Sequence, residues 1–240
     1  MEQQFIIQQQ ELKKKFRISN ERPKIEYVAG VDLAYFKQDD VEYAVCAITV
    51  VDYKTKQLVE TVTEVGEITV PYVPGYLAFR ETPLIEKTAR QLNRKVDIYM
   101  FDGNGYLHQN NMGLATCAGI ILNTRSIGVA KTYLQVGETK FAMPDEAEGA
   151  YKNIIVNGET YGCALRTHKG VKPVFVSIGH NINLEISREV VMHMVGNESR
   201  IPIPTRLADI KANKKRGEIV LLKQEYDRQN LSSIYSDIQK

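Results

Sequence analysis

The alternation of hydrophobic and polar positions in the first third of the chain predicts three β-strands. Residues 26–32 (EYVAGVD) and 42–53 (EYAVCAITVVDY) are rich in β-branched and aromatic side chains, and residues 58–65 (LVETVTEV) alternate apolar and polar positions with period two. Short polar turns separate the three runs. Because such turns connect neighbouring antiparallel strands, we expect an antiparallel meander.

The pattern changes to alternating helices and strands between residues 77 and 130. Apolar residues at helical spacing predict a helix over 77–92, and the almost wholly apolar run 96–101 (VDIYMF) predicts a strand buried on both faces. An apolar helix over 114–122 and a short strand over 126–130 follow. This order favours parallel pairing with right-handed crossovers. We therefore expect an α/β fold whose mixed sheet, of a five-stranded type, carries helices on both faces.

The rest of the chain adds a hairpin and further helices. Asn157-Gly158, between two apolar runs, is the strongest hairpin signal in the sequence. The other predicted elements are a polar surface helix over 2–19, a strand over 173–178, a helix over 183–195 and a charged helix over 205–240. The chain contains no internal repeat and no linker, so we expect a single domain over residues 1–240.

Composition and charge narrow the class of protein. The chain has 240 residues, 43% of them hydrophobic and 25% charged, which excludes a disordered chain, a collagen-like repeat and a coiled coil. A net charge of +2 excludes a histone-like protein but not a nucleic-acid enzyme. Cys46, Cys117 and Cys163 form no C-x-x-C pair, and no apolar run has the length of a signal peptide or a membrane span. We expect a reduced, cytoplasmic protein without a membrane partner.

Three carboxylates stand where α/β sheets expose chemistry. Asp32 ends the first predicted strand, Asp102 directly follows the strand 96–101, and Glu81 lies in the first turn of the helix 77–92. Carboxylates without a partnering Cys or His pair suit Mg²⁺ or Mn²⁺, and such sites are typical of phosphoryl chemistry. The alternative is that each has a structural role: Asp32 would cap a strand end, Asp102 would begin a D-G turn, and Glu81 would favour a helix N-terminus.

Two loops next to these carboxylates are candidates for binding. The DGNG segment at 102–105 lacks the third glycine of a dinucleotide motif, because His108 stands there, so we interpret its glycines as a place of close backbone approach to a ligand. His108 could contact a phosphate or shuttle a proton. In PYVPGY (71–76), two prolines stiffen a loop that presents Tyr72 to stack on a base or, alternatively, to pack in a turn.

Several of these pieces occur in the same order in endonuclease V, a family of inosine-directed nucleases with an RNase H-like fold, and the chain resembles that family. The matching segments are GVDLAY (30–35), PYVPGYLAFRETP (71–83), FDGNGYLH (101–108), GLA (113–115), IGVAK (127–131) and PTRLAD (204–209). The combination of the P-Y-x-P loop with DGNG is specific, so we expect the family's fold and activity.

The resemblance implies a role for each matching residue. Those expected to be catalytic are Asp32, Glu81, Asp102, His108, Lys131 and Asp209. Within this set Asp32, Glu81 and Asp102 match the metal-binding carboxylates, His108 and Lys131 match positions near a phosphate, and Asp209 replaces the histidine of many members. Tyr72 matches the wedge that takes the place of the displaced base. Gly75, Leu77, Gly103, Gly105 and Gly113 match positions at or near the hypoxanthine pocket, and Pro74 and Arg80 complete the expected substrate-binding residues.

The same resemblance implies a reaction and a partner. The enzyme is expected to flip deoxyinosine out of the DNA stack and, with Mg²⁺ or substituting Mn²⁺, to hydrolyse the second phosphodiester bond on its 3′ side. The products are a 3′-hydroxyl and a 5′-phosphate, as a step of DNA repair. Two alternatives stay open: an endoribonuclease specific for inosine in RNA, and a binder of deaminated nucleic acid that cleaves weakly.

One segment departs from the family pattern. The family usually reads H-P-R-R after the glycine loop, whereas residues 108–111 here read HQNN, so two cations are missing beside the expected phosphate path. We expect weaker or more salt-sensitive binding, or compensation by Arg80, Arg125 or Lys131. Basic clusters at 13–17 and 211–216 either extend the nucleic-acid footprint or are solvated helix faces.

Overall fold

The three β-rich runs of the first third pair as predicted. In the computed structural model, which describes residues 2–238 and the side chains of residues 3–226, β1 (Tyr27–Gln38) lies antiparallel to β2 (Val41–Asp52), and β2 lies antiparallel to β3 (Leu58–Glu67). Strand β1 is longer than predicted, because Leu33 and Tyr35 continue the inward-facing series that begins at Ala29 and Val31. The prediction that Asp32 ends this strand was therefore wrong.

The α/β half of the prediction is confirmed. Strand β4 (Ile98–Phe101) pairs in parallel with β1 on one side and with β5 (Arg125–Ala130) on the other. Helices α2 (Leu77–Ala89) and α3 (Leu114–Ile121) provide the connections. Glu81 lies in the second turn of α2 rather than the first, since the helix begins at Leu77.

The predicted hairpin joins the main sheet. Strands β6 (Tyr151–Val156) and β7 (Glu159–Leu165) meet at Asn157 and Gly158, whose φ angles of 51° and 84° suit a type I′ turn. Strand β7 pairs with β8 (Val174–His180), and β8 pairs antiparallel with β5. The sheet of the described residues therefore has eight strands in the order β3-β2-β1-β4-β5-β8-β7-β6, more than the five-stranded type expected.

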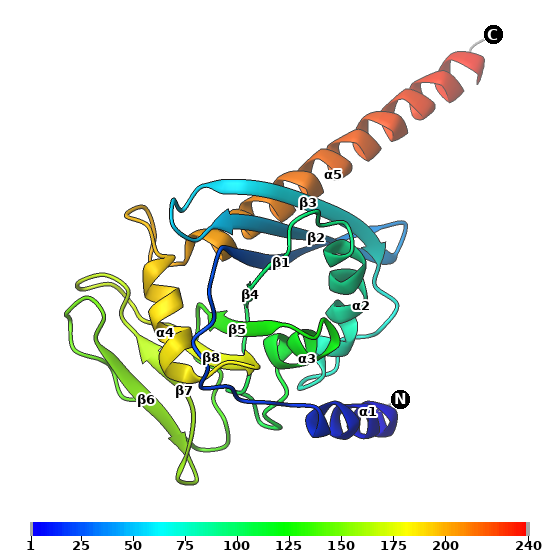
Figure 1. Cartoon of the computed structure of the whole chain (residues 1–240). Helices are drawn as coiled ribbons and strands as arrows, with labels where there is room; N and C mark the ends of the chain where they lie inside the picture. The colour runs from blue at the N-terminus through cyan, green and yellow to red at the C-terminus, as the bar shows by residue number, and fades with distance from the viewer. Residues whose placement is uncertain (1, 239–240) are drawn as a thin grey trace.

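Helices cover both faces of the sheet, as predicted (Figure 1). Alternate strand residues face opposite sides, so that Ala29 and Val31 pack in the cluster beneath α2 and α3. Val28 and Ile98 pack in the other cluster, with α4 (Leu184–His193) and the first turns of α5 (Ile203–Ile238). The result is a three-layer arrangement typical of α/β proteins.

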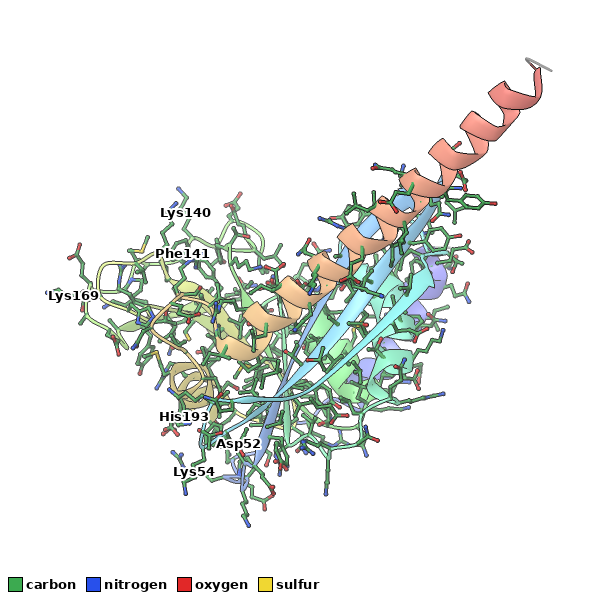
Figure 2. All side chains as sticks on the ribbon, turned by 90° about the horizontal axis from the view of Figure 1, so that it is seen from above. Asp52, Lys54, Lys140, Phe141, Lys169 and His193 are labelled. Atoms are coloured by element: carbon green, nitrogen blue, oxygen red, sulfur yellow. The ribbon has the colours of Figure 1, made fainter. Side chains whose placement is uncertain are left out.

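The contact between α5 and β1 places a helix directly on the carboxylate-bearing strand. A Cβ on Gly30 would lie 2.0 Å from the carbonyl carbon of Pro204, so only glycine allows this approach. Thr49 Oγ1 donates a hydrogen bond to the Pro204 carbonyl at 2.8 Å, and Ala212 packs on small side chains of β1 and β2. Figure 2 shows α5 crossing this face of the sheet and continuing beyond it.

The N-terminal helix α1 (Glu2–Lys14) is mostly exposed, as predicted, but it ends before residue 19 and one side of it packs against the rest of the protein. Phe5 and Gln9 are buried, and the Phe5 ring stacks on Phe79 of α2 with 5.1 Å between the ring centroids. The three cysteines are free and buried. Within the described part of the chain, no helix is both long and apolar enough to cross a membrane.

Candidate active site

Three aspartates from distant parts of the chain meet at one end of the sheet. Val31 pairs with Phe101 in the parallel register of β1 and β4, so the next residues, Asp32 and Asp102, are neighbours. Helix α5 adds Asp209 from above β1. One carboxylate oxygen of each aspartate lies within 4.8 Å of the others. The structure thus brings three predicted site residues together: Asp32 and Asp102 from the strand region and Asp209 from the C-terminal helix.

Lys131 lies among these carboxylates. Its ammonium is 2.5 Å from Asp102 Oδ2 and 3.2 Å from Asp209 Oδ2. Burial lowers the pKa of Lys131, but the hydrogen bonds and charges of the two aspartates outweigh this effect and raise its pKa overall. Lys131 is therefore a firmly charged cation that balances part of the negative charge of the cluster.

The cluster retains a negative charge that suits a divalent cation. Burial, together with the charges of Asp102 and Asp209, raises the pKa of Asp32 to about 7 even though Lys131 acts in the opposite direction. Ionising all three aspartates is therefore costly, because Lys131 balances only one of the three charges. The donors are hard oxygens without a thiolate or imidazole, and the residues present fit Mg²⁺ or Mn²⁺.

Glu81 lies outside this group of three. Its carboxylate accepts a 2.6 Å hydrogen bond from the Tyr35 hydroxyl, and only 6% of the residue is exposed. Burial raises the pKa of Glu81 to about 7, with a smaller contribution from Asp102, while Tyr35 and Arg80 act to lower it. The structure thus places Glu81 beside the cluster, in electrostatic contact with Asp102. Tyr35 was not singled out from the sequence, although it ends the GVDLAY segment.

Two of the three cations expected to offset the missing arginines, Arg80 and Arg125, have their partners elsewhere, whereas Lys131 lies among the carboxylates. The Arg80 guanidinium is buried, lies 2.6 Å from Glu42 and donates to the Val70 carbonyl, and Arg80 is not among the residues that line the pocket described below. Arg125 begins β5, at the opposite end of that strand from Lys131, and its nearest carboxylate is Glu21 at 3.8 Å. Among the described residues, no hydrogen bond or ion pair joins either arginine to the loop 108–111.

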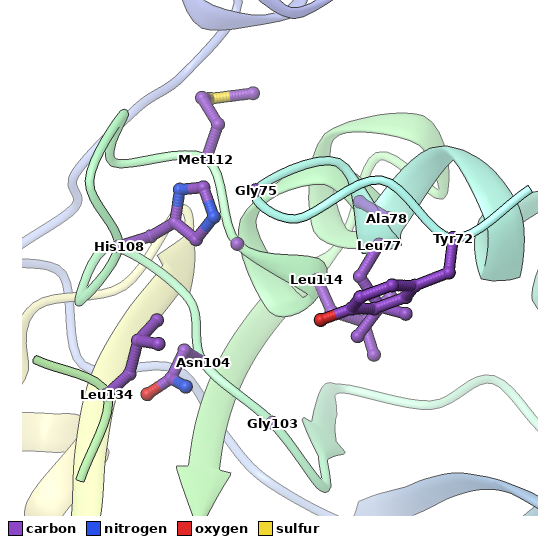
Figure 3. A pocket seen from close by; sticks show the side chains of 11 residues that line it. Tyr72, Gly75, Leu77, Ala78, Gly103, Asn104, His108, Met112, Leu114 and Leu134 are labelled. Atoms are coloured by element: carbon purple, nitrogen blue, oxygen red, sulfur yellow. The ribbon is translucent and has the colours of Figure 1, made fainter.

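A pocket of about 180 Å³ opens beside the carboxylates, between the P-Y-x-P loop and the loops that follow β4 and β5 (Figure 3). Apolar side chains and glycine backbone line most of it, and a few polar groups are present, as in sites for small planar ligands. Its lining residues are Tyr72, Gly75, Leu77, Ala78, Gly103, Asn104, His108, Met112, Gly113, Leu114 and Leu134. Six of these residues were predicted from the sequence to belong to the site: Tyr72, Gly75, Leu77, Gly103, His108 and Gly113.

Tyr72 stands at the mouth of the pocket, and Gly113 forms its wall. The Tyr72 side chain is free to meet a ligand, since 67% of the residue is exposed. A Cβ on Gly113 would lie 2.4 Å from the Asn104 carbonyl oxygen, so glycine is required for the two loops to touch. The backbone of both loops is therefore within reach of a ligand in the pocket.

Besides Arg80, two residues predicted to bind the substrate do not line the pocket, whereas other residues line it without having been predicted. Gly105 lies behind the wall, where its N–H donates to Ser177 Oγ at 2.8 Å, and Pro74 is not among the lining residues. Asn104, Met112 and Leu134 line the pocket without having been predicted. Asn104 belongs to the DGNG segment and could have been inferred from it, whereas Leu134 lies in an irregular segment after β5 with no local signal.

His108 faces the pocket in its neutral form. Its Nδ1 accepts a 3.2 Å hydrogen bond from the Asn110 N–H, so the proton of the ring is on Nε2. Burial lowers the pKa of His108 to about 4. Near neutral pH the ring is thus an uncharged donor rather than a cation.

The lowered pKa of His108 predicts that the free energy of unfolding falls at acid pH, and that the substitution His108→Asn removes this dependence. The unfolded chain binds a proton at His108 below a pH of about 6.5, but the folded protein does so only below about 4, so stability falls as the pH falls through this window. Relative to His108→Asn, whose amide oxygen can still accept from Asn110, the wild type is expected to lose about 2 kcal/mol between pH 7 and pH 5. Urea unfolding of both proteins measures the difference, and parallel pH curves would contradict it.

The fold and the site together define a nuclease of the RNase H-like class, with acidic residues at the end of a mixed sheet beside a ligand pocket. The family model of endonuclease V matches residues 10–210, and the chain belongs to that family. It is an endonuclease, a hydrolase of phosphodiester bonds.

Individual relatives agree with this assignment. Endonuclease V of Bacillus thuringiensis subsp. konkukian (strain 97-27) is 48% identical over 220 residues, which cover 91% of this chain and 94% of the relative. The crystal structure of the Bacillus subtilis endonuclease V superposes with a TM-score of 0.88 at 47% identity, covering 91% of this chain and 93% of that one. The crystal structure of endonuclease V of Ciona intestinalis, in complex with a 24mer DNA containing an inosine followed by a ribo-adenosine, superposes with a TM-score of 0.79 at 28% identity. The superposition covers 90% of this chain and 98% of that one.

Proposed function

We propose that this endonuclease cleaves DNA at deoxyinosine, with Mg²⁺ as its cofactor and Mn²⁺ as a substitute, in DNA repair. The bond hydrolysed is the second phosphodiester on the 3′ side of the lesion, and the products carry a 3′-hydroxyl and a 5′-phosphate. The relative from Ciona intestinalis binds a DNA that contains inosine, which supports this choice of substrate.

The observation that carries the proposal is the position of the carboxylates next to the pocket. The hollow that contains Asp102 and Lys131 shares Gly103, Asn104 and Leu134 with the pocket wall. A base held in the pocket therefore brings the following phosphates of its strand toward the three aspartates. Such a neighbourhood suits a nuclease that recognises one base and cuts the backbone beside it.

Several residues that line the pocket would each bind a different part of the substrate. Tyr72, rigidly presented at the pocket mouth, fills the space that the flipped base leaves in the stack. The backbone of Gly75, Gly103 and Gly113 lines the pocket and offers hydrogen-bonding groups to the base edge. His108 provides a neutral Nε2–H donor on the same wall. Together these groups hold the base without covalent contact, which agrees with strand cleavage rather than base removal.

Asp32, Asp102 and Asp209 would hold the metal, and the family resemblance adds Glu81 from beside them. A bound Mg²⁺ supplies stabilisation of the charge on the reacting phosphate and lowers the pKa of the attacking water. Lys131 is charged and touches two of the aspartates, so its ammonium is placed to donate to a phosphate oxygen that enters the site.

An RNA substrate is the second candidate. The DNA bound to the Ciona intestinalis enzyme has a ribonucleotide directly after the inosine, so that family member accommodates a 2′-hydroxyl there. An inosine-specific endoribonuclease would use the same carboxylates and the same pocket. Contact with the 2′-hydroxyl is the property that would distinguish the two substrates.

A cleavage assay on end-labelled strands tests the proposal. DNA with one deoxyinosine, RNA with one inosine and unmodified strands are each incubated with Mg²⁺ or with EDTA. We expect a metal-dependent cut one nucleotide 3′ of the deoxyinosine nucleotide, and slower cleavage of the RNA. Faster cleavage of RNA would favour the endoribonuclease. A folded protein that binds inosine strands in Mg²⁺ without cutting them would instead be the weakly cleaving binder.

A further inference from the structure

A second hollow lies on the other side of the base pocket, between α1 and the loop 108–112. It measures about 410 Å³, and Met112 belongs to both its wall and that of the pocket. Its polar side chains are amides, one phenol and one ammonium, from Gln9, Gln10, Gln109, Asn110, Tyr76 and Lys13, and its lining contains no carboxylate. Uncharged hydrogen-bonding groups with a single cation suit an anionic, hydrogen-bonding ligand rather than an apolar one.

Lys13 is the cation of this hollow, and neutral groups alone hold it. Its Nζ donates to the Asn110 carbonyl at 3.3 Å and to Asn111 Oδ1 at 3.5 Å. Within the described part of the chain, no carboxylate forms an ion pair with it. The neighbouring Lys14, by contrast, lies 2.5 Å from Glu11 Oε1. The Lys13 charge is thus oriented by the loop and available to an incoming anion.

Helix α1 is fixed in place as one wall of the hollow. Gln9 donates to the Met112 carbonyl at 3.5 Å and accepts from Asn110 Nδ2 at 2.8 Å. The stacking of Phe5 on Phe79 attaches the start of the helix to α2. Because α1 is held by both the loop 108–112 and α2, a ligand in the hollow would contact side chains whose positions are already fixed.

Three hollows therefore follow one another along the surface. The hollow with Asp102 and Lys131 shares residues with the base pocket, and the base pocket shares Met112 with the hollow at Lys13. If the base is in the middle and the cleaved bond is on its 3′ side at the aspartates, the strand must leave in the opposite direction on its 5′ side.

We propose that the hollow between α1 and the loop 108–112 binds the backbone of the strand 5′ of the inosine, with Lys13 on a phosphate. This inference rests on the proposed function, which sets the direction of the strand. It assigns a substrate-binding role to the N-terminal helix, whose first residues, 2–9, lie outside the family match. It also gives the strand a cation that the HQNN loop itself does not provide.

The salt dependence of cleavage tests this role. Each phosphate contact on a single strand contributes a slope of about −0.7 to the logarithm of affinity against the logarithm of salt concentration. For Lys13→Gln, kcat/KM on a deoxyinosine strand is expected to be lower at low salt and to lose about fivefold less than wild type over a tenfold rise in salt. Lys13→Arg should restore the wild-type slope, and Lys14→Gln is the matched control.

A shortened substrate separates phosphate binding from an indirect effect on the loop. On a strand whose first nucleotide is the deoxyinosine, Lys13→Gln and wild type should cleave equally, because no 5′ phosphate is present to contact. An unchanged salt slope, or an equal loss on the shortened strand, would overturn the inference. A wild-type enzyme that does not cut at deoxyinosine would instead refute the proposed function on which it rests.

Discussion

Replacing Asp32 by asparagine is expected to lower the cleavage rate by about 10³-fold or more while the protein stays folded and still binds inosine strands. The carboxylate is one of three whose oxygens lie within 4.8 Å of one another, so its loss removes one of the proposed metal ligands. Asparagine has the same shape, which preserves the packing of β1 beneath α5. Single-turnover cleavage in Mg²⁺, with binding measured in parallel, gives both quantities.

Thermal unfolding supplies an independent measurement of the same variant. The raised pKa of Asp32 shows that its ionisation is unfavourable in the metal-free cluster, so asparagine should increase the melting temperature without metal. Mg²⁺ should stabilise the wild type, by about 2.7 kcal/mol at a hundredfold excess over Kd, and stabilise Asp32→Asn much less. Asp40→Asn, in the exposed turn after β1, is the matched control. Cleavage at the wild-type rate by Asp32→Asn would refute the ligand assignment.

The neighbourhood of Asp32 and Asp102 was predictable because it follows from local rules. Asp102 directly follows the short, buried strand β4, and Asp32 lies within β1 next to the residue that pairs with the end of β4. The strand–helix–strand order makes these strands parallel, so their equivalent positions meet. The length of β1 was not predictable from residues 26–32 alone. It depends on pairing with β2, in which Ala34 faces Val45 and Gln38 faces Val41. That pairing extends the strand beyond Asp32.

Contacts that depend on tertiary packing were accessible only through the family resemblance or not at all. Asp209 reaches the cluster because Gly30 lets Pro204 approach β1, a relation between residues far apart in the chain. Arg80 follows the P-Y-x-P loop closely in the sequence and was therefore expected to bind the substrate. In the structure its buried guanidinium instead forms an ion pair with Glu42 of β2. Lys13 is the opposite case: the sequence shows it only as part of a basic cluster, whereas the structure fixes its ammonium against the loop 108–111.

Tyr72→Ala is expected to reduce binding of duplex DNA containing deoxyinosine by about ten- to a hundredfold, because stacking of a base on an aromatic ring contributes about 1–3 kcal/mol. The loss should be smaller on single strands, in which no neighbouring stack needs to be filled when the base leaves it. The variant should fold normally, since the side chain is 67% exposed. Affinity for paired duplex and single-stranded oligonucleotides, each with and without deoxyinosine, provides the comparison.

Two further variants define what the Tyr72 ring does. Tyr72→Phe retains the aromatic face and should bind nearly as wild type, which separates stacking from any hydrogen bond of the hydroxyl. Tyr226→Ala removes an equally exposed aromatic side chain on α5, away from the pocket, and should have no effect. If Tyr72→Ala keeps the full preference for deoxyinosine over an unmodified duplex, the ring does not act as a wedge. The pocket itself, through Gly75, Gly103 and His108, would then carry the whole discrimination.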